Sequence, residues 1–251
     1  MKFIRTVFLL LAISLSTDLS ATHLLGGEIY WECTGNGRYI FTLVLYRDCE
    51  TGSASIPTVA QTLNSPFGSI VCNYIQPGPN TYDNDVSPQC GDPNLVLDCN
   101  AGDRGSLEKG IYRSAPTSLS GSPPATGWEI SWQRCCRPNY PQDLVNLSSN
   151  GYYLRSVMYP YTPPGATQPL NTNNCYDNSP QFAQDANGVS CPGFVYEFNH
   201  LPSDKDVDSL VFDWAQPMEN ANQPAVFAPG YTNTAPFPDA TENAANGPNT
   251  L

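Results

Sequence analysis

The residues best suited to chemistry are carboxylates that recur at every second position late in the chain. Asp204, Asp206 and Asp208 form a short acidic run. Upstream, Asp177 and Asn178 add oxygen donors just before an expected strand start. Alternating carboxylates around a turn converge, and Ca²⁺ prefers such hard oxygen ligands. We therefore expect these five residues to bind Ca²⁺, with a solvated acidic turn as the alternative.

Sequence motifs of known catalytic sites are absent. The acidic run is not an EF-hand, because Ser209 replaces the Gly at loop position six and Ala215 replaces the Glu at position twelve. No zinc-protease, nucleophile-elbow, phosphate-loop or dinucleotide motif occurs. Paired carboxylates of a glycosidase leave no sequence signature, so a hydrolase stays as an alternative. We expect a chain that is not an enzyme.

Cysteines are the second chemically informative group. The nine cysteines are all disulfide candidates: Cys33, Cys49, Cys72, Cys90, Cys99, Cys135, Cys136, Cys175 and Cys191. Because their number is odd, at least one has no partner within the chain. Cys135 and Cys136 fall on opposite faces of a predicted strand, and a bond between adjacent residues needs a strained backbone, so we expect each to bond elsewhere. Many cysteines in an exported chain indicate an oxidising compartment.

The N-terminus has the pattern of an export signal. Lys2 and Arg5 precede an apolar run at 7–15, which is too short to span a bilayer. Small and polar residues follow, and cleavage after Ala21 would leave residues 1–21 as the signal peptide, with cleavage after Ser16 as the alternative. We expect a secreted or cell-surface protein whose mature chain does not insert into a membrane.

Composition limits the fold class and the partners. The 251 residues include 19 Gly and 24 Pro, and only 14 % are charged, which disfavours long amphipathic helices. The formal charge of −12 and the absence of a basic block disfavour binding to nucleic acid. What remains is an all-β, loop-rich, disulfide-stapled protein of one or two immunoglobulin-like β-sandwiches.

Period-two patterns mark the elements that must position these groups. The first is a hairpin turning at Asn36 and Gly37, in which Cys33 would face Ile40. Cys49 lies nine residues beyond Ile40, which is roughly 30 Å along the strand. Cys33 and Cys49 are therefore not expected to bond to each other. The other expected strands lie at 39–48, 69–74, 95–99, 111–113, 128–136, 152–159, 194–198 and 210–214. A Pro- and Asn-rich linker spans 161–176, and the chain from about 216 onward reads as a disordered tail.

The large aromatic residues of these strands have two interpretations. Trp128, Trp132 and Trp214 alternate with polar residues, which favours packing in a core. The alternative is a carbohydrate-binding module, in which some aromatic side chains form an exposed surface for stacking against sugars.

Several of these strings together resemble one kind of known protein. The matching stretches lie at 21–30, 39–49, 132–137, 178–182 and 204–210, and the string Arg134-Cys135-Cys136-Arg137 is the most specific of them. In order and spacing they resemble the N-terminal region of very large secreted surface proteins of Bacteroidetes, the kind that carries a gliding-motility-associated C-terminal domain for type IX secretion. The resemblance covers most of residues 21–215.

The last part of the chain resembles a cadherin-like unit. Asp177, Asn178, Asp204 and Asp206 match the positions that bind Ca²⁺ in cadherin repeats, and Val207 stands where related proteins usually have Gly. The resemblance implies a β-sandwich domain at 22–160 and an incomplete second sandwich at 177–251, as in a fragment of a longer protein. It also implies adhesion or surface architecture through an extracellular protein or glycan partner.

Overall fold

The computed structural model is all-β, as the composition predicts. It describes residues 24–50, 55–78, 83–89, 96–135, 137–138, 143–146, 151–162, 165, 167, 177–188 and 198–234. Twelve strands occur: β1 (Leu24–Gly35), β2 (Arg38–Asp48), β3 (Gln61–Ser65), β4 (Gly68–Tyr74), β5 (Leu107–Ser114), β6 (Thr117–Ser118), β7 (Trp128–Cys135), β8 (Gly151–Met158), β9 (Gln181–Phe182), β10 (Pro202–Ser203), β11 (Met218–Asn220) and β12 (Gln223–Pro224). In these ranges no helix is long and apolar enough to cross a bilayer. The predicted export signal and most of the predicted linker lie outside the described residues.

The first hairpin turns where the sequence predicts but pairs one residue out of the expected register. Asn36 and Gly37 form the turn with φ values of 54° and 66°, as a type I′ turn requires. A bulge between Cys33 and Gly35 then inserts one extra residue into β1, so Cys33 faces Tyr39 instead of Ile40. A bulge next to a turn has no signature in the alternation pattern, which explains the one-residue error.

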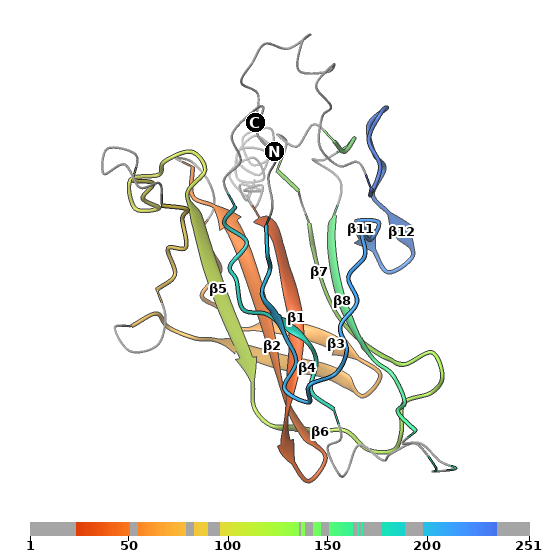
Figure 1. Ribbon diagram of the computed structural model, residues 1–251. Coiled ribbons are helices and arrows are strands. Elements are labelled where there is room, and N and C mark those ends of the chain that lie inside the picture. The colour runs from red at the N-terminus through yellow and green to blue at the C-terminus, as the bar shows by residue number, and fades with distance from the viewer. Residues whose placement is uncertain are drawn as a thin grey trace, which may run out of the picture.

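Strands β1 to β8 form one sheet that curls until its edges meet (Figure 1). The order is β1-β2-β5-β4-β3-β7-β8, with β6 paired to β2, and it is not clearly that of an immunoglobulin domain. At the closing edge the Tyr152 hydroxyl of β8 donates a hydrogen bond to the Leu24 carbonyl of β1. A Cβ on Gly27 of β1 would meet the Val44 carbonyl oxygen at 2.2 Å and Leu154 at 2.9 Å, so only glycine allows this approach.

The enclosed space is filled by large apolar side chains. Tyr39, Phe41, Leu43 and Leu45 are fully buried on one face of β2. Thr42 and Val44 are buried on the other, as expected for a strand covered on both faces. Residues from the other strands of the sheet complete the cluster: Trp31, Leu63, Ile70, Tyr112, Trp128, Ile130, Trp132 and Met158. The core packing predicted for Trp128 and Trp132 is confirmed.

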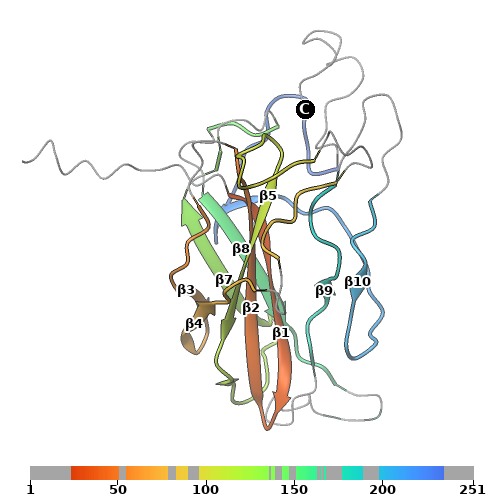
Figure 2. The same cartoon turned by 90° about the vertical axis from the view of Figure 1, so that its left-hand side faces the viewer.

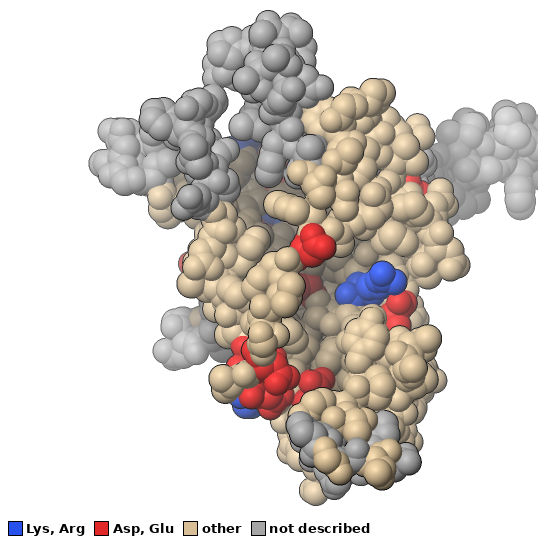
Figure 3. Space-filling view, turned by 45° about the vertical axis from the view of Figure 1, so that its right-hand side comes forward, with Lys and Arg blue, Asp and Glu red and all other residues tan. Residues whose placement is uncertain are grey.

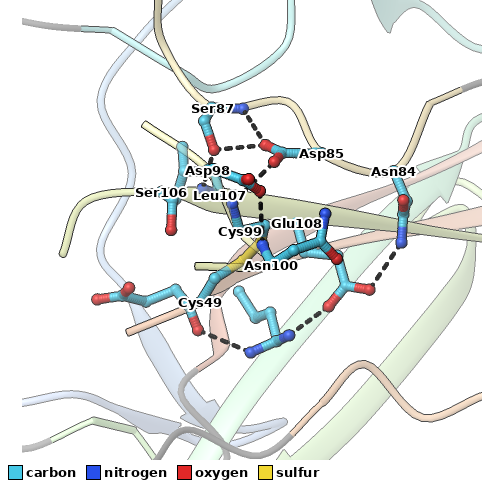
Figure 4. Close-up of a disulfide and its surroundings, with 12 residues drawn as sticks. Cys49, Asn84, Asp85, Ser87, Asp98, Cys99, Asn100, Ser106, Leu107 and Glu108 are labelled. Atoms are coloured by element: carbon cyan, nitrogen blue, oxygen red, sulfur yellow. Dashed lines mark hydrogen bonds and ion pairs between the residues drawn. A yellow bond between two sulfur atoms is a disulfide. The ribbon is translucent and has the colours of Figure 1, made fainter. Parts of the chain in front are cut away.

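A disulfide fastens the loops at one end of the sheet (Figure 4). It joins Cys49, just after β2, to Cys99, so Cys49 does not bond to Cys33, as predicted. Asp85 supports the same loop because its carboxylate accepts hydrogen bonds from the backbone of Cys99 and from Ser87. Burial alone would raise the pKa of Asp85, but these hydrogen bonds lower it. Such a disulfide is typical of proteins that fold in an oxidising compartment.

The other described cysteines divide into two kinds. Cys33 and Cys135 are disulfide-bonded. Cys72, counted among the disulfide candidates, is instead a free thiol buried in the core, and burial raises its pKa to about 12. A thiol with such a pKa is inert at neutral pH. Cys90, Cys136, Cys175 and Cys191 lie outside the described residues.

Three expectations about strands are wrong. Strand β3 was not expected, because its five residues are polar apart from Leu63. The strand expected at 95–99 is only a single bridge between Val96 and Gln89. In the described part of the tail expected from about 216, the β11–β12 hairpin forms instead, where Ala225 packs with Leu144 and the Met218 carbonyl accepts a hydrogen bond from Arg137. Residues 235–251 lie outside the described residues. These contacts are distant in sequence, so local composition does not predict them.

Candidate functional site

The predicted acidic residues meet beside the outer edge of β1. The Asn178 backbone N–H donates to Asp206 Oδ2 at 2.6 Å, and the Asn178 side-chain amide donates to Asp206 Oδ1 at 2.9 Å. Asp204 Oδ1 accepts hydrogen bonds from the backbone of Asp206 at 2.8 Å and of Asp208 at 3.3 Å, which closes the acidic turn. Segments 28 residues apart in the chain are thus joined.

Asn178 and Ser179 fasten this turn to the sheet. Asn178 Oδ1 accepts a hydrogen bond from the Cys33 backbone N–H at 2.8 Å. Ser179 Oγ accepts one from the Trp31 N–H at 2.8 Å, and the Ser179 N–H donates to the Trp31 carbonyl at 3.1 Å. Both residues are buried, so these bonds satisfy edge groups of β1 that water does not reach.

Asp177 is electrostatically the most strained member of the group. Its carboxylate accepts a hydrogen bond from the Trp31 indole N–H at 3.2 Å. Burial raises the pKa of Asp177 to about 6, with further increases from the negative charges of Asp206, Asp204 and Asp208, while the Trp31 hydrogen bond acts in the opposite direction. No lysine or arginine is among the influences on the pKa of Asp177.

The arrangement leaves the calcium prediction untested. Figure 3 shows a compact group of acidic side chains on one face of the molecule. Within the part of the chain that the structure describes, no three His, Cys, Asp or Glu side chains are grouped so that they could hold a metal ion. Both oxygens of Asp206 are engaged by Asn178, and the side-chain oxygen of Asn178 is engaged by Cys33. Cation binding would require these hydrogen bonds to be exchanged for metal ligands.

A second polar contact holds the segment after β9 against the sheet. Lys109 of β5 donates to Asp185 Oδ1 at 2.6 Å, and the Tyr46 hydroxyl of β2 donates to the same oxygen at 3.2 Å. Burial, followed by the charges of Asp185 and Glu28, raises the pKa of Tyr46 above its ordinary range. Burial also raises the pKa of Glu28. The segment is therefore anchored at both ends, by Ser179 and by Asp185.

Beyond these anchors lies a surface of exposed apolar side chains, which we call the apolar strip. Its members are Phe182, Leu201, Val207, Val211, Phe212 and Trp214, all exposed. The rings of Phe182 and Phe212 lie 6.5 Å apart between centroids, and His200 lies 5.0 Å from Phe182. Figure 2 shows β9, which carries Phe182, beside β1. Large apolar side chains exposed this close together in the chain are typical of interaction sites.

The strip corrects two predictions. Trp214, expected in the core with the other tryptophans, is 59 % exposed. The strand expected at 210–214 does not form, because no described strand pairs with it. The alternation of Leu210, Phe212 and Trp214 is a correct description of the sequence, but a strand also needs a partner. Residues 194–197 of the other predicted strand lie outside the described residues.

Comparisons with known proteins add no identification: no family model, no curated protein and no solved structure matches this chain. The candidate site is therefore defined by its geometry. Sequence reasoning selected Asp177, Asn178 and the acidic run but not Ser179 or Asp185, which do most of the anchoring. The available signal was the position of Ser179 beside the predicted ligands, since a short polar side chain ahead of a strand often bonds to backbone.

Proposed function

We propose that this chain is a non-enzymatic extracellular or cell-surface module for adhesion or surface architecture, of the gliding-motility-associated, type IX-secreted kind. The observation that carries the proposal is the apolar strip, fastened to a disulfide-linked sheet through Ser179 and Asp185. Exposed apolar area costs solubility unless a partner covers it. The rigid sheet supplies the support, and the strip supplies the contact.

The test is binding to the surface of the cells that produce the protein. Fluorescently labelled, oxidised protein spanning 22–251 is titrated against intact cells and against cells stripped of surface protein by protease. The double variant Leu201→Ser/Trp214→Ser should lower the affinity at least tenfold. The matched control Val59→Ser/Tyr161→Ser changes two equally exposed apolar residues outside the strip and should bind as the unchanged protein does. Absence of binding, or equal loss in both variants, would contradict the proposal.

A carbohydrate-binding module is the second candidate, favoured by the exposed ring cluster. Phe182, His200 and Phe212 are exposed and in ring contact, with Phe198 edge-on to His200 at 4.7 Å. Aromatic faces stack well on the apolar faces of neutral sugars. An array of neutral oligosaccharides is probed with the oxidised chain and with the variant Phe182→Ala/His200→Ala. Binding that the variant loses supports a glycan partner. An array without signal contradicts the carbohydrate-binding candidate.

Ca²⁺ is proposed as a ligand of the acidic turn. It is supported by Asp177, whose pKa is raised by burial and by the negative charges of Asp206, Asp204 and Asp208. Extracellular calcium modules bind with dissociation constants of about 0.1–1 mM, so 5 mM CaCl₂ should stabilise the protein by about 1–2 kcal/mol over EGTA. Asp206→Asn should abolish the shift in Tm, whereas Asp143→Asn, outside the turn, should preserve it. An unchanged Tm would exclude the site.

A further inference from the structure

Residues 209–215 have the pattern of a strand but lie outside any sheet of the described chain. Figure 1 shows the segment as a drawn-out ribbon leading to β11. Val211 is 92 % exposed and Phe212 is 57 % exposed. Among the described residues, the backbone groups of 209–213 make no hydrogen bond to another backbone group. Unpaired backbone groups flanked by β-branched and aromatic side chains are the feature that another strand completes.

The limits of this segment are symmetric about Phe212. At one end Val207 has a φ of 65°, a left-handed conformation that a β-branched residue does not keep within a strand. At the other end stands Pro217, which has no N–H to donate. Both limits are five residues from Phe212. An antiparallel pairing centred on Phe212 therefore places Val207 of one copy opposite Pro217 of the other. The hydrogen-bond ladder between the two copies ends at this pair on each side.

The side chains within these limits are complementary in the same register. Phe212 faces its own copy, and Leu210 faces Trp214, so one face of the pair is wholly apolar. On the other face Val211 is opposite Asp213, and no two carboxylates of 209–215 are opposed. Asp208, the nearest acidic residue of the turn, falls opposite Gln216. Like charges directly opposite would destabilise the pair, and this register avoids them.

We infer that the segment 209–215 pairs with the same segment of a second copy, antiparallel about Phe212, to form a two-fold dimer of this chain. The inference does not require the proposed adhesion, but both use the same surface, because Phe212 and Trp214 belong to the apolar strip. The isologous pair supplies partners for the backbone groups of 209–213 and removes Phe212 and Trp214 from water. The Trp214 N–H already donates to Asp213 Oδ1, and the Trp214 carbonyl already accepts from Asn233. The formal charge of −12 on each chain opposes association, so screening by salt should strengthen the dimer.

Sedimentation equilibrium of the oxidised chain tests the dimer. The unchanged protein at 1–200 µM should show a monomer–dimer equilibrium that is tighter in 0.5 M than in 0.05 M NaCl. Phe212→Asp places two carboxylates opposite each other at the two-fold axis and should weaken the dimer at least a hundredfold. Val59→Asp, at an exposed residue away from the segment, should leave it unchanged. Near-ultraviolet circular dichroism of each variant confirms that the fold is intact.

A mixing experiment identifies the register. Phe212→Asp and Phe212→Lys should each be monomeric, but an equimolar mixture should form a one-to-one dimer, because only the central pairing brings the two changed residues together. A monomeric unchanged protein, a dimer unaffected by Phe212→Asp, or a mixture that stays monomeric would each overturn the inference. Cell binding by a strictly monomeric protein would leave the proposed adhesion standing while this inference fails.

Discussion

The sheet and the segment that follows it contain similar residues in opposite environments. Phe41 in β2 is fully buried, whereas Phe212 is 57 % exposed, and both occupy strings of alternating or continuous apolar residues. The sheet buries its aromatic side chains because eight strands pair and curl around them. In the described residues 181–188 and 198–216, the strands are the two-residue β9 and β10, and no apolar side chain is buried.

The difference shows that apolar pattern and apolar burial have separate causes. A pattern makes burial favourable, but burial also needs neighbouring strands. The segment obtains its order instead from polar contacts with the sheet, through Asn178, Ser179 and Asp185. Its apolar side chains therefore remain available to partners, which is the arrangement expected for an interaction surface.

The largest expected effect is the loss of stability when a buried aromatic ring is removed from the sheet. Phe41→Ala should lower the free energy of unfolding by about 3–5 kcal/mol, because it removes a fully buried ring and leaves a cavity. Phe212→Ala deletes the same ring from the exposed segment and should change it by no more than about 0.5 kcal/mol. Urea unfolding of both variants measures the two values. Similar losses would show that Phe212 is part of the core.

The disulfide tests how the sheet is held at its loop end. Cys49 and Cys99 are separated by 50 residues in the sequence, and replacing both by Ser opens the covalent loop between them. The free energy of unfolding should fall by about 4 kcal/mol, because the unfolded chain regains the entropy that the disulfide removes. The unfolding midpoint of the double variant should fall, but the docking of 177–179 on Trp31 and Cys33, near the hairpin turn and away from the disulfide, should persist. Cys72→Ser is the control, since Cys72 is unpaired and buried. A smaller loss for Cys49→Ser/Cys99→Ser than for Cys72→Ser would contradict this account.

Sequence reasoning succeeded where structure is local. The turn at Asn36 and Gly37 needs only two positive φ values, β2 is predicted from its continuous apolar run, and β7 is predicted from its alternation. It failed where a long-range contact decides. The docked β11–β12 hairpin depends on Arg137, 81 residues earlier in the chain. The bulge that moves Cys33 from Ile40 to Tyr39 is local, and it was missed because it leaves no mark in the alternation of apolar residues.

The candidate site shows the same division. The acidic run and the Asp177–Asn178 pair were selected from spacing alone, and the structure does bring them together through Asn178 and Asp206. The use of their oxygens was not predictable. Most hydrogen-bond acceptors of the cluster serve backbone N–H groups, such as that of Cys33, whose position depends on the edge of a sheet formed about 145 residues earlier.

An intermediate effect concerns the anchor between the two regions. Asn178→Ala removes the acceptor of the Cys33 N–H and the donors to Asp206, so it should lower the free energy of local opening of 177–208 by about 1–3 kcal/mol. Hydrogen exchange should accelerate in 177–188 while amides of β2 keep their protection. Asn222→Ala, at an exposed turn, is the control. Uniform acceleration across both regions would mean that they open as one unit.

The smallest expected effect is a pH dependence confined to the docked segment. Because the pKa of Asp177 is about 6 in the folded chain and about 3.9 when unfolded, protonation favours the folded state. Its stabilising contribution is complete below pH 4 and is lost as the pH rises through 6. Solvent screening of a half-buried carboxyl limits the change to about 1 kcal/mol.

The comparison of the unchanged chain with Asp177→Asn isolates this contribution. Glu28 also has a raised pKa and contributes in the same direction, but it is present in both proteins and cancels in the difference. Relative to Asp177→Asn, the unchanged chain should therefore lose local stability in 177–188 between pH 4 and pH 7, as measured by hydrogen exchange corrected for intrinsic rates. A difference that is flat over this range would show that Asp177 is ionised throughout. Burial and the charges of Asp204, Asp206 and Asp208 would then not raise its pKa.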